Sequence, residues 1–444
     1  RLLLLAAPET YTDPAHARRL VEEVRAIEGE RGLRWKRARA NCLARAAEWR
    51  EHEAEIVALL NACIRADPEW AAAYTDLGLL HERLGRVAEA EAAFRKALRV
   101  GPECARAADA LFSLLVRQGR LAEADDVLAR IPLLPKAGQS HPLPGPDVDA
   151  WTQQLVELEL AARLDPRDVD ASVRAARQYG LRGDPDRALA LLDLCDRSMP
   201  GSVLPAWTRM LILRAAGRED AALTSVHPTV ADDPAAALLR ARTLWLVGRR
   251  SEALEAYRRL ADAHGQEGRK LLAGFLLECG RARQAAEVLQ VASLVAPNDV
   301  DLRVRLAEAR AEFVEPADEP GFTAELDNLR ELAPNHPRGL AASGVYLRRE
   351  GSADARQRAI AELEKGIEQD PGYVRLHVHL LDALLQAGQL REAARAAGRA
   401  LQYCPDSPAI LRRCARIEQQ LQRLTLAQRT AERAVALDPH DIEG

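Results

Sequence analysis

The sequence predicts an all-α fold, a right-handed superhelical solenoid of about twelve helix-turn-helix repeats. Hydrophobic residues make up 48% of the chain but aromatic residues only 4%, and leucine and alanine supply most of the apolar content. This composition favours helices over a β-rich core. A fixed period in the sequence then indicates stacked helical units. The period is near 34 residues, and it is marked by Pro68 and Pro102 and again by Pro166, Pro200 and Pro234.

Residues 71–104 show one repeat most clearly. The first half presents a helical face and ends at Gly85, a residue type that terminates helices and begins turns. The second half carries an apolar stripe at helical spacing. Small residues such as Gly78 and Ala97 let the two helices approach closely, and Phe94 fills the space between them. A closing proline cannot continue a helix but suits the start of the next segment.

This pattern resembles the tetratricopeptide repeat. The consensus of that repeat has a leucine–glycine pair, then an alanine with an aromatic residue four positions later, and then a proline, as in Leu77-Gly78, Ala90, Phe94 and Pro102. The offsets recur in register over nearly the whole chain. The resemblance implies stacked helix pairs whose first helices line a concave, protein-binding groove. The expected units are residues 37–70, 71–104, 105–131, 148–168, 169–202, 203–236, 237–265, 266–299, 300–336, 337–373, 374–407 and 408–441.

The departures from the period predict the domain limits. Residues 1–36 are expected to form an N-terminal capping helical segment, because Asp13 and Pro14 suit a helix start. An N-terminal array over 37–131 follows, and a C-terminal array over 148–444. Between them, the proline-rich residues 132–147 cannot form the helix that the register demands. This loop is either a tolerated surface insertion or a segment that lies in the groove or docks a partner.

A second break lies at residues 312–322, inside the repeat that begins at Val300. Its acidic residues and its two phenylalanines, Phe313 and Phe322, could form a recognition tip. The alternative is a longer turn whose phenylalanines pack locally.

The residues give little support to catalysis, a cofactor or a metal site, and we expect none of the three. The chain lacks the H-E-x-x-H, phosphate-loop and G-x-S-x-G motifs. Its seven cysteines are odd in number, and none are spaced C-x-x-C, which favours small core residues in a reducing compartment. A net charge of −4 argues against nucleic acid as a partner.

The groove implied by the resemblance is rich in arginine. Arginine forks pair with carboxylates or phosphates, and tryptophan supplies anchoring area. We therefore expect an acidic or C-terminal peptide segment, or an acidic partner surface, in the groove. The alternative is that these arginines are solvated or paired with neighbouring Asp and Glu. The predicted contacts are Arg106, Arg117, Arg174, Arg177, Trp207, Arg214, Trp245, Lys270, Arg349, Arg375, Arg412 and Arg416, and the groove positions also hold Arg242, Arg305, Arg348 and Arg413.

Function is thus expected to be non-catalytic: a bacterial protein–protein interaction scaffold, part of a larger complex. One alternative is the substrate-presenting part of a larger enzyme or complex. Another is an envelope-associated protein for assembly or export. The opening run Leu2–Ala7 has six apolar residues, too few to span a bilayer. We expect a cytoplasmic protein, or a periplasmic or membrane-anchored one if a signal or anchor precedes Arg1.

Overall fold

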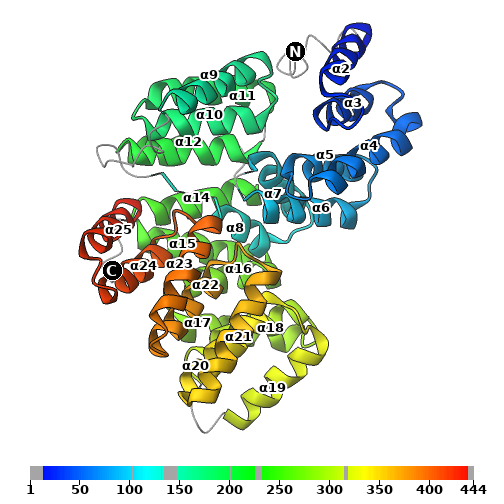
Figure 1. Ribbon diagram of the computed structural model, residues 1–444. Helices are drawn as coiled ribbons and strands as arrows, with labels where there is room; N and C mark the ends of the chain where they lie inside the picture. Colours follow the sequence, from blue (N-terminus) through cyan, green and yellow to red (C-terminus); the bar gives the residue numbers. More distant parts are fainter. Residues whose placement is uncertain are drawn as a thin grey trace. The chain divides into compact units, whose positions relative to one another are not determined.

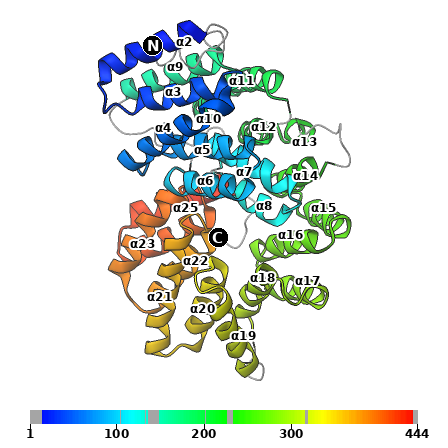
Figure 2. The same cartoon turned by 90° about the vertical axis from the view of Figure 1, so that its right-hand side faces the viewer.

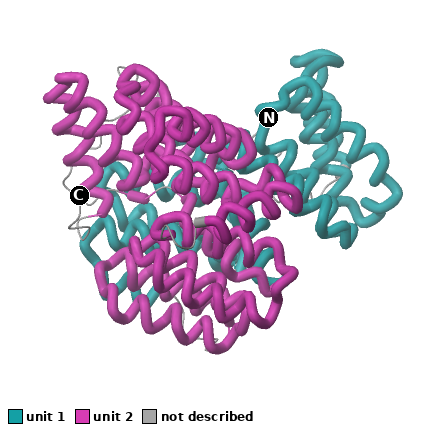
Figure 3. The backbone as a smooth tube through the Cα atoms, turned by 90° about the horizontal axis from the view of Figure 1, so that it is seen from below, with its two compact units in different colours: residues 1–118, 136–226 teal, residues 119–135, 227–444 magenta. Residues whose placement is uncertain are grey.

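The computed structural model describes residues 14–102, 104–131, 133–134, 148–200, 202–225, 233–314 and 319–438. In these ranges every regular element is helical, and most helices pack as consecutive antiparallel pairs (Figure 1). The predicted all-α fold of stacked helix pairs is confirmed. The chain forms two compact units (Figure 3): unit 1 comprises residues 1–118 and 136–226, and unit 2 comprises residues 119–135 and 227–444.

Unit 1 contains the helices of the first repeats and those that follow the proline-rich stretch. Helix α7 packs against α6 in its own array and against α10 and α12 of the later one. The helices are α2 (Pro14–Glu28), α3 (Arg34–Arg45), the 3₁₀ helix η2 (Trp49–His52), α4 (Glu53–Ala66), α5 (Ala71–Arg83), α6 (Val87–Val100), α7 (Ala105–Arg117), α9 (Val148–Leu164), α10 (Val169–Leu181), α11 (Pro185–Ser198), α12 (Val203–Ala215) and α13 (Glu219–Ser225).

Unit 2 contains α8 and the helix pairs that follow one another from α14 to α25 (Figure 2). The helices are α8 (Leu121–Ala129), α14 (Pro234–Leu246), α15 (Arg250–Ala263), α16 (Gly265–Glu278), α17 (Ala282–Val295), α18 (Val300–Ala311), α19 (Glu319–Leu332), α20 (Pro337–Glu350), α21 (Ala353–Gln369), α22 (Val374–Gln386), α23 (Leu390–Tyr403), α24 (Pro408–Gln420) and α25 (Leu424–Leu437).

The first helices of unit 2 form one surface, which we call the first-helix layer: α14, α16, α18, α20, α22 and α24. From α16 to α24 each of these helices contacts the next one. The second helices, α15 to α25, pack outside them in the pairs. Any side chain that points away from the second helices therefore faces a surface shared by several repeats.

Glycine and proline act where the sequence places them. The backbone of Gly85, with φ of +74°, turns the chain between α5 and α6. Pro68 lies between the end of α4 and the start of α5, where no helical hydrogen bond is lost. A Cβ added at Gly78 would lie 2.5 Å from Cε1 of Phe94, so only glycine permits the close approach of α5 and α6.

The limits of the two units differ from the domain limits expected from sequence. The expected pair over residues 105–131 is divided, because α7 belongs to unit 1 and α8 to unit 2. Carboxylates help to hold α7 in place: Asp170 of α10 accepts a hydrogen bond from the backbone N–H of Ala105 at 3.1 Å. Asp109 of α7 accepts from the N–H groups of Val203 and Leu204, at 2.9 and 3.0 Å, and so caps the start of α12.

The two predicted breaks lie partly outside the described residues. Of the proline-rich residues 132–147, only Leu133 and Leu134 lie within the described residues, and both belong to unit 2. In the second break, residues 315–318 lie outside them. Phe322 is buried and meets Tyr346 edge to face, with ring centroids 5.4 Å apart. This phenylalanine packs locally, as the second of the two alternatives expects.

Candidate functional site

Helix α8 lies on the first-helix layer and packs mainly against α16, with a smaller contact to α14. Its apolar residues Leu121, Ala124 and Leu128 are buried, as expected for the second helix of a repeat. Asp125, in the middle of the helix, is also buried. A buried carboxylate is costly unless a cation and hydrogen bonds compensate for the lost water, so the layer must supply these partners.

Asp125 is held by a guanidinium fork from α14. Nε and Nη2 of Arg242 donate to the two carboxylate oxygens of Asp125 at 2.6 and 2.9 Å. The hydroxyl of Tyr257 lies 3.3 Å from both oxygens. Arg242 also donates to Glu278 at the end of α16, at 2.6 and 2.8 Å. One arginine thus connects α8 with two helices of the layer.

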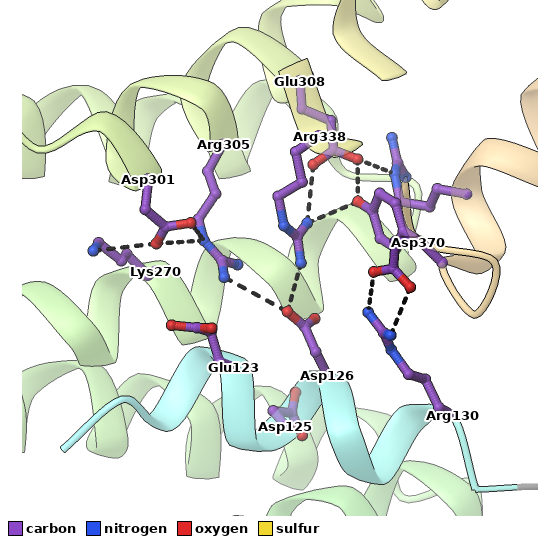
Figure 4. A network of polar contacts seen from close by, with 12 residues as sticks. Glu123, Asp125, Asp126, Arg130, Lys270, Asp301, Arg305, Glu308, Arg338 and Asp370 are labelled. Carbon is purple, nitrogen blue, oxygen red and sulfur yellow. Dashed lines mark hydrogen bonds and ion pairs between the residues drawn. The ribbon is translucent and has the colours of Figure 1, made fainter. Parts of the chain in front are cut away.

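Asp126, the next residue, contacts α18 and α20 (Figure 4). Its Oδ2 atom accepts from Nη2 of Arg338 at 2.7 Å and lies 3.6 Å from Nη2 of Arg305. Both arginine side chains are less than a tenth exposed. Each also keeps a carboxylate of its own layer, since Arg305 pairs with Asp301 at 3.0 Å and Arg338 with Glu308 at 2.9 Å.

The charges reverse one helical turn later. Arg130, just beyond α8, donates through Nη1 and Nη2 to the two oxygens of Asp370 at 2.8 and 2.7 Å (Figure 4). Asp370 lies in the turn between α21 and α22, where the N–H of Gly372 also donates to it. Leu133 packs against the cluster of Leu411, Ala434 and Leu437 on α24 and α25. The described residues between Leu121 and Leu133 thus contact unit 2 from α14 and α16 to α24 and α25.

The polar network continues behind α8 within the layer. Glu308 accepts from Nε of Arg375 at 2.8 Å and contacts the hydroxyl of Tyr373. Nη2 of Arg375 also donates to Glu312 at 2.9 Å. Together with Arg338, these contacts fix the side chains of α18, α20 and α22 relative to one another, because Glu308 of α18 binds side chains from both other helices.

The two aspartates of α8 have opposite pKa shifts. Burial raises the pKa of Asp125 to about 6, although Arg242 opposes this shift. Burial acts on Asp126 in the same direction, but the positive charges of Arg338, Arg305 and Arg130 outweigh it, so the pKa of Asp126 lies below its ordinary value. At neutral pH both side chains carry the negative charge that the arginines bind.

The predicted contacts in unit 2 fall into two groups. Lys270 and Arg375 are paired within the layer, Lys270 with Asp301 at 3.2 Å and with Asp299 at 2.7 Å. Arg349, on the exposed side of α20, donates to the carbonyl oxygens of Ala311 and Val314. Arg412 is half-buried and Arg416 is exposed, both on α24, and Trp245 lies edge-on to Phe275, with ring centroids 5.2 Å apart.

The predicted contacts in unit 1 are mostly buried or paired with other side chains of unit 1. Trp207 and Arg214 are buried, and Arg177 is half-buried. Arg106 pairs with Asp76 at 3.0 Å, Arg117 with Glu82, and Arg174 with Asp170 at 3.5 Å. The pairing with neighbouring carboxylates, the alternative left open by the sequence, is thus present at these positions.

Arg338 and the pair Asp125–Asp126 were not among the contacts predicted from the sequence. Arg338 is the second residue of its repeat, and the predicted contact Arg375 has the same position in the next repeat. This shared position could have indicated that Arg338 lies on the same surface. The acidic pair gave no comparable signal, because acidic residues on a second helix normally face water.

The described residues contain no cluster of histidine, cysteine and carboxylate side chains that could hold a metal ion. The cysteines are free thiols in the structure, and burial raises the pKa of Cys195 to about 11 and that of Cys414 to about 12. Burial thus keeps these two thiols protonated and unreactive, because a thiol must ionise to react. No helix in the described ranges has the length and apolar character needed to cross a membrane.

Residues 71–104 match the family model of the tetratricopeptide repeat. Solved structures that resemble the chain include a thermophilic TPR protein of Thermus thermophilus (20% identity, 40% of this chain and 94% of that one, TM-score 0.35). The Cut9–Hcn1 hetero-tetramer of the APC/C is 14% identical over 97% of this chain and 89% of that one, with a TM-score of 0.37. Yeast Tom70 is 12% identical over 90% of this chain and 91% of that one, with a TM-score of 0.40.

A search among curated proteins found no match. The matched repeat and the consecutive helix pairs of both units nevertheless agree in period and in packing. Residues 71–104 are therefore a tetratricopeptide repeat, set within a chain of consecutive helix pairs.

Proposed function

We propose that this chain is a non-catalytic scaffold for protein–protein interaction, and that the first-helix layer of unit 2 binds an acidic segment of a partner protein. Tetratricopeptide repeat proteins mediate such interactions. One observation carries the finer proposal: the layer already holds the carboxylates of an acidic helix, α8, through Arg242, Arg305 and Arg338. A surface that compensates buried carboxylates in this way has the chemistry of an acidic-peptide receptor.

The part of the layer proposed for the partner lies on α22 and α24. Arg413 donates to both oxygens of Asp382 at 3.2 Å, and Arg348 lies 3.8 Å from the same carboxylate. Two arginines thus share one acid there. Arg416 is exposed and pairs with no carboxylate among the described residues. Arg416 thus offers positive charge for a carboxylate from outside the chain.

A displayed library of random peptides tests this function with a defined probe. Selection on the full chain is expected to enrich sequences rich in Asp and Glu, whose binding weakens as salt increases. The Arg412→Glu/Arg416→Glu variant is expected to lose this enrichment. Arg429→Glu is the matched control, since Arg429 is exposed on α25, a second helix. Enrichment of neutral peptides, or acidic enrichment that survives reversal of both arginines, would contradict the proposal.

All seven cysteines are free and four of them are buried, which supports a reducing compartment, and we therefore propose a cytoplasmic location.

A further inference from the structure

We propose that α8 is an internal ligand, and that the Arg242–Arg305–Arg338 site takes in its place an acidic helix of a partner protein. The fitting helix has two adjacent carboxylates and a basic residue one turn later, as Asp125, Asp126 and Arg130 do. This inference rests on the proposed function, because it uses the same first-helix layer as the binding surface.

The first support is the path of the chain. Residues 119–135 belong to unit 2, whereas the residues before and after them belong to unit 1. Helix α8 therefore comes to the layer from outside the array that forms it. It has nine residues, whereas α6, the second helix of the preceding repeat, has fourteen. A short inserted helix held by another array is placed as a bound peptide would be.

The second support is that the receptor has its own structure without α8. Each arginine that binds α8 also binds a carboxylate of unit 2. Arg242 keeps Glu278, Arg305 keeps Asp301, and Arg338 keeps Glu308. These contacts hold the guanidinium groups in position when α8 leaves, so an incoming helix meets a preorganised site.

The third support is selectivity. Buried ion pairs gain little over their desolvation cost, so exchanging one acidic helix for another with the same charges changes the free energy little. An apolar or basic helix would leave Asp126's partners Arg305 and Arg338 buried beside an unsuitable side chain. The Arg130–Asp370 pair adds a fixed direction, because it places the positive charge beside α22.

A labelled peptide with the sequence of residues 119–134 tests the proposal in the full chain. Its binding is compared for the wild type and for the Asp125→Asn/Asp126→Asn variant. Loss of the ion pairs of Asp126 with Arg338 and Arg305 weakens the hold on α8 in this variant, but the layer is unchanged. The variant is expected to bind the peptide at least about tenfold more tightly than the wild type, because less free energy is needed to displace its own helix. A peptide carrying the same two substitutions is the matched control and is expected to bind neither protein.

Circular dichroism and thermal unfolding establish that the variant is folded. If it is not, Arg130→Gln replaces it, since this change removes the ion pair with Asp370 and one positive charge near Asp126 but leaves both aspartates in place. Adding Arg338→Gln to the variant is expected to abolish peptide binding. Failure of the peptide to bind any folded variant would show that α8 is an integral helix and overturn the inference. Acidic enrichment of the peptide library that survives the Arg412→Glu/Arg416→Glu reversal would instead count against the proposed function.

Discussion

Helices α7 and α8 follow each other in the sequence and both lie against first helices of later repeats, but different chemistry holds them. In unit 1, Asp109 of α7 accepts hydrogen bonds from two backbone N–H groups at the start of α12. In unit 2, Asp126 of α8 meets the guanidinium groups of Arg338 and Arg305. The same residue type therefore serves as a helix cap in one unit and as a ligand for cations in the other.

This difference bears on selectivity. Every helix start offers free N–H groups, so a cap such as Asp109 fixes a helix without selecting a particular partner sequence. A buried guanidinium is satisfied only by an anion at the right place. Burial raises the pKa of Asp109, whereas the arginines lower that of Asp126 despite its burial. The attachment of α8 is thus the one that can discriminate between partners.

The largest effect is expected for Arg338→Gln. Removing this guanidinium leaves Glu308 and Asp126 without their shared cation, and Glu308 is fully buried. Breaking a buried ion pair costs about 3–5 kcal/mol of unfolding free energy. Denaturant unfolding followed by circular dichroism measures it. Arg303→Gln is the control, since Arg303 lies on the same stretch of α18 as Arg305 but donates to Asn328 at an exposed position. Equal stability of the two variants would contradict the expectation.

A smaller effect is expected for Asp109→Ala in unit 1. The loss of a helix cap costs about 1–2 kcal/mol. The cost is not expected to change with salt, because the partners of this carboxylate are backbone groups and not cations. Unfolding at low and high salt measures both quantities. A salt dependence as large as that of the Asp126→Asn variant would remove the distinction between the two attachments.

The pH dependence of unit 2 sharpens the comparison further. The pKa of Asp125 is raised from 3.8 to about 6, so its contribution to stability is greatest below pH 4 and is lost as pH rises through about 6. Asp126 has a lowered pKa and acts in the opposite direction, losing its contribution only in acid. Between pH 5 and pH 7, the wild type is expected to lose about 1 kcal/mol more than the Asp125→Asn variant. An equal change in unfolding free energy between pH 5 and pH 7 for the two proteins would refute the raised pKa of Asp125.

The smallest effect on stability is expected for Arg416→Glu. The side chain is exposed on α24, and surface substitutions of this kind change the unfolding free energy by about 0.5 kcal/mol or less. Thermal unfolding checks this expectation. A large loss of stability would mean that Arg416 is needed for the fold and is not available to a partner.

The repeat pattern was sufficient to predict the helix pairs, because it depends on local features. Gly85 turns the backbone, and Phe94 fits against Gly78 in the way that the sequence suggested. The position of α8 was not predictable in the same way. Its apolar residues resemble those of α6, and such a pattern specifies a buried face but not the helix that covers it.

The candidate site shows the same limit. The sequence indicated arginines on first helices, and Lys270 and Arg375 do belong to the network. It did not indicate their partners, because the contact between Arg242 and Asp125 joins residues 117 positions apart. The burial of Trp207 could not be predicted for a similar reason. Neighbouring helices cover its side chain, and the position of a residue within the repeat does not show which helices will cover it.

A double-mutant cycle between Asp126→Asn and Arg338→Gln tests most directly whether the guanidinium groups of the layer bind the carboxylates of α8. The two groups lie 2.7 Å apart. The account predicts a coupling free energy of about 1.5–3 kcal/mol, because residues of one buried network are strongly non-additive. Additive effects, with a coupling below about 0.5 kcal/mol, would contradict it.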